Sequence, residues 1–286
     1  MELKFTGRGA MLNPSEGNTS AYFEDDENFF LIDCGEDVAA KLIKQGKLDQ
    51  DKNYYLFITH THSDHIGSIG TLQQYLYWVK GKRLKIVVGK DMDYIKNILS
   101  IMNSLGLEPT TYDIINITTL DNRSPLFNSI RYKKSDHGDV FLESASIIIN
   151  TNEGNILYSG DIANAKVIRE FISENSSSVD KMYVDKMYID TSLNKSPVHL
   201  SLKELRDVIP IGLSGKVYCM HLDQKNLINE ARRWGFNIVE LDDSTLLDRD
   251  IESLSSEELY KLEKQLKEKL DQVESRLDKP KTFIKK

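Results

Sequence analysis

The sequence predicts a layered α/β sandwich followed by one long helix. Short apolar runs rich in β-branched and aromatic residues alternate with segments of helical period through residue 243. Two of the runs, residues 146–151 and 155–161, are separated only by a turn, so they predict an antiparallel hairpin. Because a sheet with such a hairpin is not purely parallel, the pattern favours a sandwich over a doubly wound sheet.

Seven apolar runs predict β-strands, and FFLIDCG and YYLFITH are typical of them. In chain order the predicted strands are 29–35, 54–60, 84–89, 146–151, 155–161, 187–190 and 217–222. The stretch 180–190 contains two copies of a five-residue repeat, which are too few for a solenoid. We expect a strand there with its approach loop, and Tyr183 and Tyr188 facing the core.

Segments with apolar residues three and four positions apart predict helices between these strands. Three such segments are 66–79, 92–105 and 227–234. Each is followed by a glycine suited to a helix C-cap. Ser201 and Glu204 have the spacing of a capping box and open a further short helix, which Pro210 stops.

Residues 244–286 differ in texture from residues 1–243, so we expect a globular domain followed by a helix and tail. Ser255 and Glu258 form another predicted capping box. The apolar positions that follow line one face of a long amphipathic helix: Leu259, Leu262, Leu266, Leu270, Val273 and Leu277. Two interpretations remain open, a helix that packs on its own domain and a helix that contacts a second subunit or partner.

Composition excludes several classes of protein. With 286 residues, 40% hydrophobic and 28% charged, the chain has material for a sizeable core, which excludes a wholly disordered or collagenous protein. The net charge of −7 disfavours a broad basic surface for nucleic acid. The longest apolar runs fall short of the roughly 20 residues of a membrane span, so we expect no membrane partner and a cytoplasmic location. Cys34 and Cys219 lie in apolar runs and give no reason to expect an oxidising compartment.

The stretch FITHTHSDHIGSIG, residues 57–70, carries the chemistry. We expect a strand that ends at His60, a turn, and a helix that begins near Ile66. Four candidate metal ligands would then share one loop: His60, His62, Asp64 and His65. Three of the chain's six histidines fall within these six residues. Imidazole and carboxylate are ligands that zinc accepts, so the loop predicts a metal site.

Three further candidates each end a predicted strand or lie just beyond one. His137 follows SIRY, Asp161 ends NILYSGD, and His221 ends VYCMHL. Strand ends can deliver side chains to one edge of a sandwich, where ligand sites commonly form. We therefore expect these three residues to converge with the loop.

Together these residues resemble the metallo-β-lactamase superfamily over about residues 3–243. The pattern HxHxDH, then His, Asp and His, is matched in order. The resemblance implies an αββα sandwich of the metallo-β-lactamase type, here with an added C-terminal amphipathic helix, and two zinc ions per chain, with Mn²⁺ as the alternative. It also implies that His60, His62 and His137 hold the first ion, that Asp64, His65 and His221 hold the second, and that Asp161 bridges them.

The same resemblance bears on Asp33 and on lactamase activity. Asp33 in LIDCG resembles the family's buried aspartate that orients a ligand histidine, a role worth about 10- to 100-fold in metal affinity or activity. The lactamases themselves usually have Cys where Asp161 stands and lack an acid like Asp64. Antibiotic hydrolysis is therefore disfavoured.

Two features resemble the ribonuclease Z-like phosphodiesterase branch. FTGRGAMLNPSEGNTSAYF followed by FLIDCG resembles the opening hairpin of that branch, and it lacks the third glycine of a dinucleotide fingerprint. His199, 22 residues before His221, resembles the branch's extra histidine beside the leaving group. The resemblance implies that His199 acts as general acid and that Asp64 and Asp161 take part in catalysis. An imidazole of unperturbed pKa ~6.5 can protonate a departing oxygen.

The spacing between two ligands narrows the substrate. The tRNA-processing enzymes of this branch carry a long exosite arm between the third histidine and the bridging aspartate, whereas His137 and Asp161 are only 24 positions apart. Bulky tRNA is therefore a poor substrate candidate. The remaining resemblance is to small phosphodiesterases such as the phage anti-Pycsar proteins, which destroy cyclic mononucleotide signals and are homodimers. It implies a homodimer that hydrolyses 3′,5′-cyclic nucleotides to linear monophosphates in the cytoplasm, or in the host cytoplasm for a viral protein.

Alternatives remain open at this point. One is a ribonuclease Z-type tRNA 3′-end endonuclease, and another is a lactone or thioester hydrolase with less need of His199. A non-enzymatic scaffold is disfavoured because inactive relatives generally lose ligands, whereas this chain retains all seven.

Overall fold

The computed structural model describes residues 1–89, 95–139, 142–176, 184–242 and 254–277. The chain forms two compact units, Met1–Leu241 and Asp242–Lys286. The first unit contains two six-stranded mixed sheets, and the second contains one helix. Among the described residues, no helix is both long and apolar enough to span a membrane.

The first sheet is built from the strands of the first third of the chain. Its order in space follows the sequence: β1 (Lys4–Gly7), β2 (Ser20–Glu24), β3 (Asn28–Ile32), β4 (Asn53–Phe57), β5 (Leu84–Val88) and β6 (Tyr112–Asn116). Strands β1 to β3 form an antiparallel meander, and β3 to β6 are parallel. Stacked aromatic pairs such as Tyr22 with Phe29, 5.1 Å between ring centroids, support the meander.

The second sheet has the reverse order in space. Its strands are β12 (Asn237–Ile238), β11 (Val217–Met220), β10 (Val184–Asp190), β9 (Gly154–Tyr158), β8 (Ser144–Thr151) and β7 (Ser129–Ser135). Strands β7 to β9 are antiparallel neighbours, and β9 to β12 are parallel. The predicted hairpin is therefore confirmed as β8 and β9.

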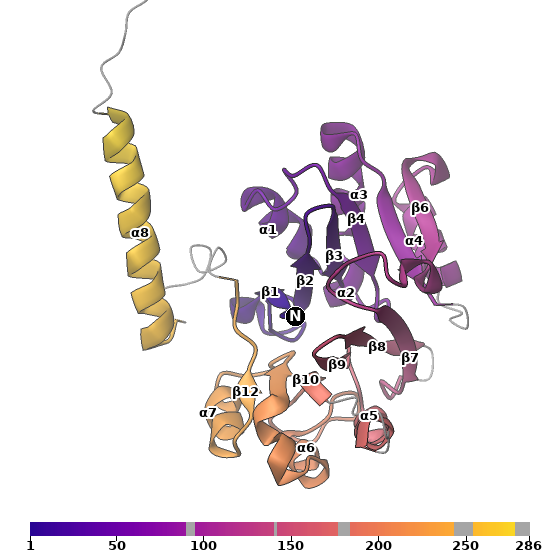
Figure 1. Cartoon of the computed structure of the whole chain (residues 1–286), viewed down its shortest axis with the longest axis vertical. Helices are drawn as coiled ribbons and strands as arrows, with labels where there is room; N and C mark the ends of the chain where they lie inside the picture. The colour runs from indigo at the N-terminus through magenta and orange to yellow at the C-terminus, as the bar shows by residue number, and fades with distance from the viewer. Residues whose placement is uncertain (90–94, 140–141, 177–183, 243–253, 278–286) are drawn as a thin grey trace, which may run out of the picture. The chain divides into compact units, whose positions relative to one another are not determined.

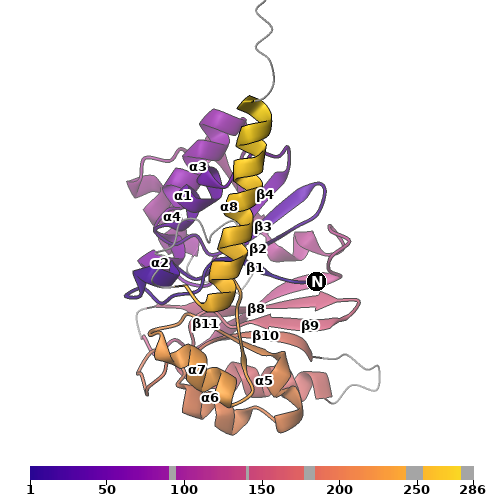
Figure 2. The ribbon, with the colours of Figure 1, turned by 90° about the vertical axis from the view of Figure 1, so that its left-hand side faces the viewer.

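The two sheets face each other and carry helices on their outer faces (Figures 1 and 2). The helices of this unit are α1 (Val38–Lys44), α2 (Ser63–Ile66), α3 (Ile69–Gln74), α4 (Ile95–Ser104), α5 (Lys166–Ser176), α6 (Leu202–Val208) and α7 (Asn226–Arg233). Helices α1, α3 and α4 pack on the first sheet, and α5, α6 and α7 pack on the second. A third cluster between the sheets contains buried Phe30, Phe57, Ile147 and Tyr158. The predicted αββα layers are confirmed.

All seven predicted strands are present, but several end earlier than expected. Strand β3 ends at Ile32 because the backbone at Asp33 adopts φ 62, a left-handed conformation that cannot continue a strand. Strand β4 ends at Phe57, and shortly after it the amide of Thr59 donates to the Asp33 side chain, 2.7 Å away. Tyr188 is buried as predicted, whereas Tyr183 lies outside the described residues.

The segment expected as one helix over 66–79 is divided. Helix α2 is followed by α3 and then by a π-helical segment, η2 (Tyr75–Val79). The break occurs at Ser68, whose amide donates to the carbonyl of Cys34 at 3.1 Å and whose hydroxyl donates to the carbonyl of Gly35. These bonds replace intrahelical ones and bring α2 close to the end of β3.

Helix α8 (Ser256–Leu277) forms the described part of the second unit. Its predicted capping box is present, since the amide of Ser255 donates to Glu258 at 2.8 Å and the amide of Glu258 donates to the Ser255 hydroxyl at 3.3 Å. Leu254 and Leu262 pack together, while Leu266 and Leu270 are exposed within this unit.

Candidate metal centre

The seven candidate ligands converge at the carboxyl ends of strands that run in one direction. Asp33 and His60 follow β3 and β4 of the first sheet. His137, Asp161 and His221 follow β7, β9 and β11 of the second sheet. This is the edge at which open α/β sheets commonly place their ligands. His62 and His199 are partly exposed, whereas the other candidate ligands are buried.

The HxHxDH segment differs from the expectation in one respect. The helix predicted near Ile66 begins at Ser63, so Asp64 and His65 lie in its first turn and not in the loop. His62 is the N-cap, with an extended backbone (φ −68, ψ 154). A carboxylate in the first turn is favoured by the helix dipole, which helps to explain why the helix starts before Asp64.

The first group of donors consists of three imidazoles. Nδ1 of His62 lies 3.1 Å from Nε2 of His60 and 3.2 Å from Nε2 of His137. An oxygen of Asp161 faces the same group, 3.7 Å from Nε2 of His60 and 4.0 Å from Nε2 of His137. These four side chains satisfy the distances expected of residues that share one ion.

The second group uses both oxygens of Asp161. Nε2 of His65 lies 3.3 Å from Oδ1 of Asp161, and Nε2 of His221 lies 3.4 Å from Oδ2. Asp64 completes the group, with Oδ2 at 3.1 Å from His221 and 3.5 Å from His65. Asp161 is therefore shared by the two groups, in the position that the sequence assigned to it.

These donors fit a divalent metal ion. Ligand atoms held tetrahedrally at about 2.0–2.1 Å from a zinc ion are roughly 3.3 Å apart, close to the separations within the two groups. Nε2 of His65 and Oδ1 of Asp64 are buried and have no hydrogen-bond partner within the described part of the chain. A buried polar atom without a partner is costly, and a metal ion would satisfy it.

Hydrogen bonds from the other ring nitrogens fix how two of the ligands face the centre. Nδ1 of His65 donates to Oδ2 of Asp33 at 2.8 Å, and Nδ1 of His137 donates to the carbonyl of Val198 at 2.9 Å. Both histidines therefore direct Nε2 toward the donor groups, as metal-ligating histidines do. Asp33 is fully buried and is held by Thr59, whose amide and hydroxyl donate to it at 2.7 and 2.9 Å.

The buried carboxylates create a strong demand for positive charge. Burial lowers the pKa of His221, but Asp161, Asp190 and Asp64 outweigh it and raise this pKa to about 10. Burial likewise opposes a charged His65, yet Asp161 and Asp33 raise its pKa well above the ordinary value. Divalent ions would meet this demand without protons on the ligands.

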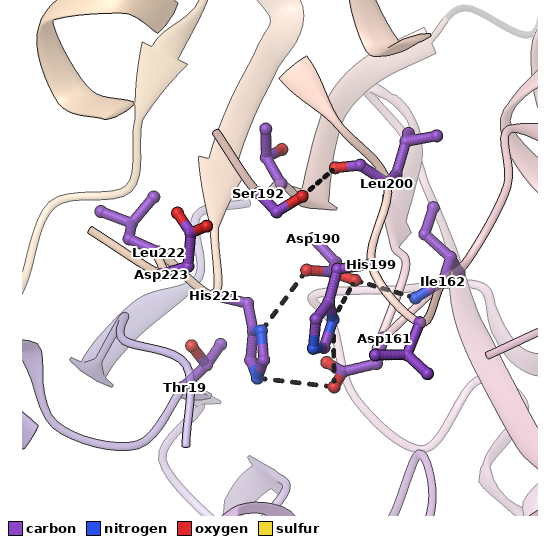
Figure 3. A network of polar contacts seen from close by, with 12 residues as sticks. Thr19, Asp161, Ile162, Asp190, Ser192, His199, Leu200, His221, Leu222 and Asp223 are labelled. Carbon is purple, nitrogen blue, oxygen red and sulfur yellow. Dashed lines mark hydrogen bonds and ion pairs between the residues drawn. The ribbon is translucent and has the colours of Figure 1, made fainter. Parts of the chain in front are cut away.

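His199 lies beside the two groups and is paired with an acid (Figure 3). Nδ1 of His199 is 3.0 Å from Oδ2 of Asp190, the last residue of β10, and 3.8 Å from Oδ2 of Asp161. Burial lowers the pKa of His199, but the hydrogen bond and charge of Asp190 outweigh it and raise the pKa. The pair favours a protonated imidazole next to the candidate metal ligands.

Sequence reasoning missed the residues that hold this site from behind. Asp190 is the main one, because it contacts both His199 and His221. Asp223 anchors the loop that leads to His199, since its carboxylate accepts from the amide of Leu193 at 3.2 Å. The position of Asp190 at the end of a predicted strand, like that of Asp161, was the one signal in the sequence.

The sandwich is similar to known structures of one fold. The metallo-β-lactamase fold protein YhfI from Bacillus subtilis matches with a TM-score of 0.63 and 17% identity, covering 83% of this chain and 95% of that chain. The short form of human tRNase Z matches with a TM-score of 0.54 and 17% identity, covering 85% of this chain and 97% of that chain. Fold and site together define a metal-dependent hydrolase of the metallo-β-lactamase fold.

A family model identifies the group within this class. The chain belongs to the anti-Pycsar protein Apyc1 family, whose model matches residues 1–241. A curated relative, the anti-Pycsar protein Apyc1 of Bacillus phage 010DV004, is 24% identical over 237 residues, which cover 77% of this chain and 88% of that protein. The match ends at the last residue of the first compact unit, Leu241.

Proposed function

We propose that this protein is a two-zinc phosphodiesterase that hydrolyses 3′,5′-cyclic nucleotides to linear nucleoside monophosphates and so removes an immune or signalling cyclic nucleotide. The observation that carries the proposal is the His199–Asp190 pair, which lies within 3.8 Å of the shared ligand Asp161. Hydrolysis of a phosphodiester requires a proton for the departing oxygen, and this pair would provide it at the edge of the metal centre. Membership of the anti-Pycsar family supports the same substrate class.

The chain's own residues suggest how the reaction would be divided between them. Two divalent ions, when bound, supply a nucleophile from water at neutral pH and offset charge that develops on the phosphoryl oxygens. His60, His62 and His137 would hold one ion, and Asp64, His65 and His221 the other, with Asp161 shared between them. Because Nδ1 of His199 is bonded to Asp190, Nε2 is the atom free to protonate the leaving ribose oxygen.

The segment between His137 and Asp161 favours a small substrate. After His137 the chain enters the β8–β9 hairpin, whose strands are joined by the two residues Asn152 and Glu153. A hairpin of this size provides no arm to hold a folded RNA, and the net charge of −7 opposes a long polyanion. A single cyclic nucleotide needs neither feature.

Three further parts of the proposal concern metal, assembly and location. Zinc suits a donor set of imidazoles and carboxylates, and Mn²⁺ is the alternative ion. We propose a homodimer, to which the exposed Leu266 and Leu270 of α8 offer an apolar contact. The proposed compartment is the cytoplasm, that of the host for a viral protein. Light scattering on the full chain tests the assembly, since a monomer's mass would contradict it.

One purified, zinc-loaded sample tests the reaction against its alternatives. It is incubated with cyclic AMP, GMP, CMP and UMP, with a precursor tRNA, and with a lactone and a thioester, and products are resolved by chromatography. We expect one equivalent of linear monophosphate from at least one cyclic nucleotide and none with Asp161→Ala. Intact cyclic nucleotides would refute the proposal. Processed tRNA or a hydrolysed acyl substrate in their place would support the corresponding alternative.

A further inference from the structure

A buried ion pair lies in the loop between β1 and β2. Nε of Arg8 is 2.7 Å from Oε2 of Glu16, and the two side chains are only 8% and 6% exposed. Nη1 of Arg8 also donates to the carbonyl of Val239 at 3.0 Å. The amide of Val239 in turn donates to the carbonyl of Cys219 in β11, 3.1 Å away. Arg8 therefore ties the opening loop to the strand that precedes His221.

The backbone of the same loop holds the residue that follows His221. The amide of Leu222 donates to the carbonyl of Arg8 at 2.8 Å. Its carbonyl accepts from the amide of Ala10 at 3.1 Å and from Nδ2 of Asn13 at 2.8 Å. Both backbone groups of Leu222 are thus held by the segment that carries Arg8.

Gly9 lets this loop fold closely on itself. A Cβ at Gly9 would lie 2.6 Å from the carbonyl oxygen of Asn13 and 2.9 Å from that of Gly17. Since real Cβ atoms do not approach backbone so closely, the tight path requires glycine. The GRG motif and Glu16 are therefore explained together, as parts of one compact clamp around Leu222.

His221 needs such a clamp. Its backbone has φ 57, a left-handed conformation that non-glycine residues seldom adopt. Among the described non-glycine residues only Asp33, Asn122 and His221 have positive φ, and the first and last belong to the metal centre. A conformation of this kind persists only where the surroundings hold it in place. If Leu222 were released, His221 could relax and move Nε2 away from Asp64 and Asp161.

A buried ion pair is a poor device for stability alone, because an apolar pair of similar volume is often at least as stable. What a charged, hydrogen-bonded pair provides is a fixed geometry. We infer that Arg8 and Glu16 are positioning residues for the His221 side of the metal centre. The inference rests on the proposed two-ion centre but not on the identity of the substrate.

The test compares metal binding by variants of the full chain. Arg8→Met removes the cation at similar length, and Glu16→Gln removes the anion at nearly constant shape. Lys52→Met is a matched control, because Lys52 pairs with Glu24 at 2.8 Å, the two side chains are 10% and 18% exposed, and Lys52 precedes β4 at the end opposite His60. Zinc is titrated in competition with a chromophoric chelator, and thermal unfolding is followed by circular dichroism.

We expect Arg8→Met and Glu16→Gln each to weaken one of the two zinc equivalents by about 10- to 100-fold and to leave the other unchanged. The double variant should be no weaker than the worse single variant, since the two residues act as a unit. Lys52→Met should bind both ions like the wild type, even if its melting temperature falls.

Two results would overturn the inference. One is wild-type affinity for both ions in Arg8→Met, and the other is an equal loss in Lys52→Met. If Arg8→Met fails to fold, Glu16→Gln and Arg8→Lys decide the question by the same titration. A wild type that binds two zinc ions yet leaves cyclic nucleotides intact would count against the proposed function only.

Discussion

Oδ2 of Asp190 lies 3.0 Å from Nδ1 of His199, and Oδ1 of the same carboxylate lies 3.4 Å from Nδ1 of His221. One acid at the end of β10 therefore contacts both the proposed proton donor and a candidate metal ligand (Figure 3). Asp190 is completely buried, and the amide of Ile162, next to Asp161, also donates to it at 3.0 Å. Its two oxygens thus link the proton donor to the metal centre.

This double contact predicts different consequences for two substitutions. His199→Gln should lower kcat by about 10²- to 10⁴-fold, the contribution of a general acid, without changing zinc affinity. Asp190→Asn should lower kcat and also weaken zinc binding by about 10- to 100-fold, because it removes the carboxylate behind His221. Turnover and zinc titration on the same preparations separate the two effects. Zinc loss in His199→Gln would make His199 a structural or ligand residue.

Gly138 sets the approach between the His137 loop and the loop that carries His199. It has φ 78, and a Cβ there would lie 2.3 Å from the carbonyl oxygen of Pro197. We predict that Gly138→Ala displaces His199 and lowers kcat by about 10²-fold, a loss typical of a misplaced catalytic group. Gly106→Ala is the control, because Gly106 has φ 71 but nothing within 4 Å of its Cβ position.

Both glycine variants should lose about 1 kcal/mol of unfolding free energy from the left-handed backbone, but only Gly138→Ala should lose activity. Denaturant unfolding and turnover at saturating substrate measure the two quantities. Equal activity in the two variants would show that the contact with Pro197 does not control the position of His199.

Asp33 should control metal affinity through His65. Its carboxylate accepts from Nδ1 of His65 at 2.8 Å, so Asp33→Asn should weaken zinc binding by about 10- to 100-fold. Asp25→Asn is a suitable control, since Asp25 also accepts from two backbone amides, those of Glu27 and Asn28, but has no contact with the centre in the described structure. Comparable zinc affinity in the two variants would argue against an orienting role for Asp33.

Removal of metal should destabilise the first unit. The centre gathers buried histidines and carboxylates whose charges the ions would balance. A ligand present at 100 times its Kd stabilises the folded state by about 2.7 kcal/mol. For a protein of this size that corresponds to roughly 5–10 °C in melting temperature. Differential scanning calorimetry with chelator, and again after zinc is restored, measures the shift. A melting temperature that ignores both additions would contradict a structural contribution of the metal.

The ligands were predictable because their chemistry is concentrated in the sequence. His60, His62, Asp64 and His65 lie within six residues, and so dense a group of imidazoles and carboxylates is typical of a metal site. Asp190 was not predictable in the same way, since an aspartate at a strand end is more often a turn former. Its role depends on two residues, His199 and His221, that only the folded chain brings to its carboxylate.

The same distinction applies to the fold. Strands with continuous apolar runs were found, whereas helix α1 (Val38–Lys44) was missed because seven residues give only two turns of pattern. Residue-by-residue backbone conformation was also beyond reach. The left-handed conformation of His221 depends on hydrogen bonds that Arg8 and Asn13 make to Leu222, more than 200 positions along the chain.

The two cysteines should be inert in the native protein. Burial raises the pKa of both thiols to about 12, assisted at Cys34 by the nearby charge of Asp33. Because the thiolate is the reactive form, only about one thiol in 10⁴ is ionised at pH 8, and both side chains are inaccessible. We predict no reaction of the native protein with a thiol-specific disulfide reagent at pH 8. Unfolding in guanidinium should restore an ordinary pKa and release two equivalents. A rapid native reaction at either cysteine would show that its strand opens, and single Cys34→Ala and Cys219→Ala variants would identify which one.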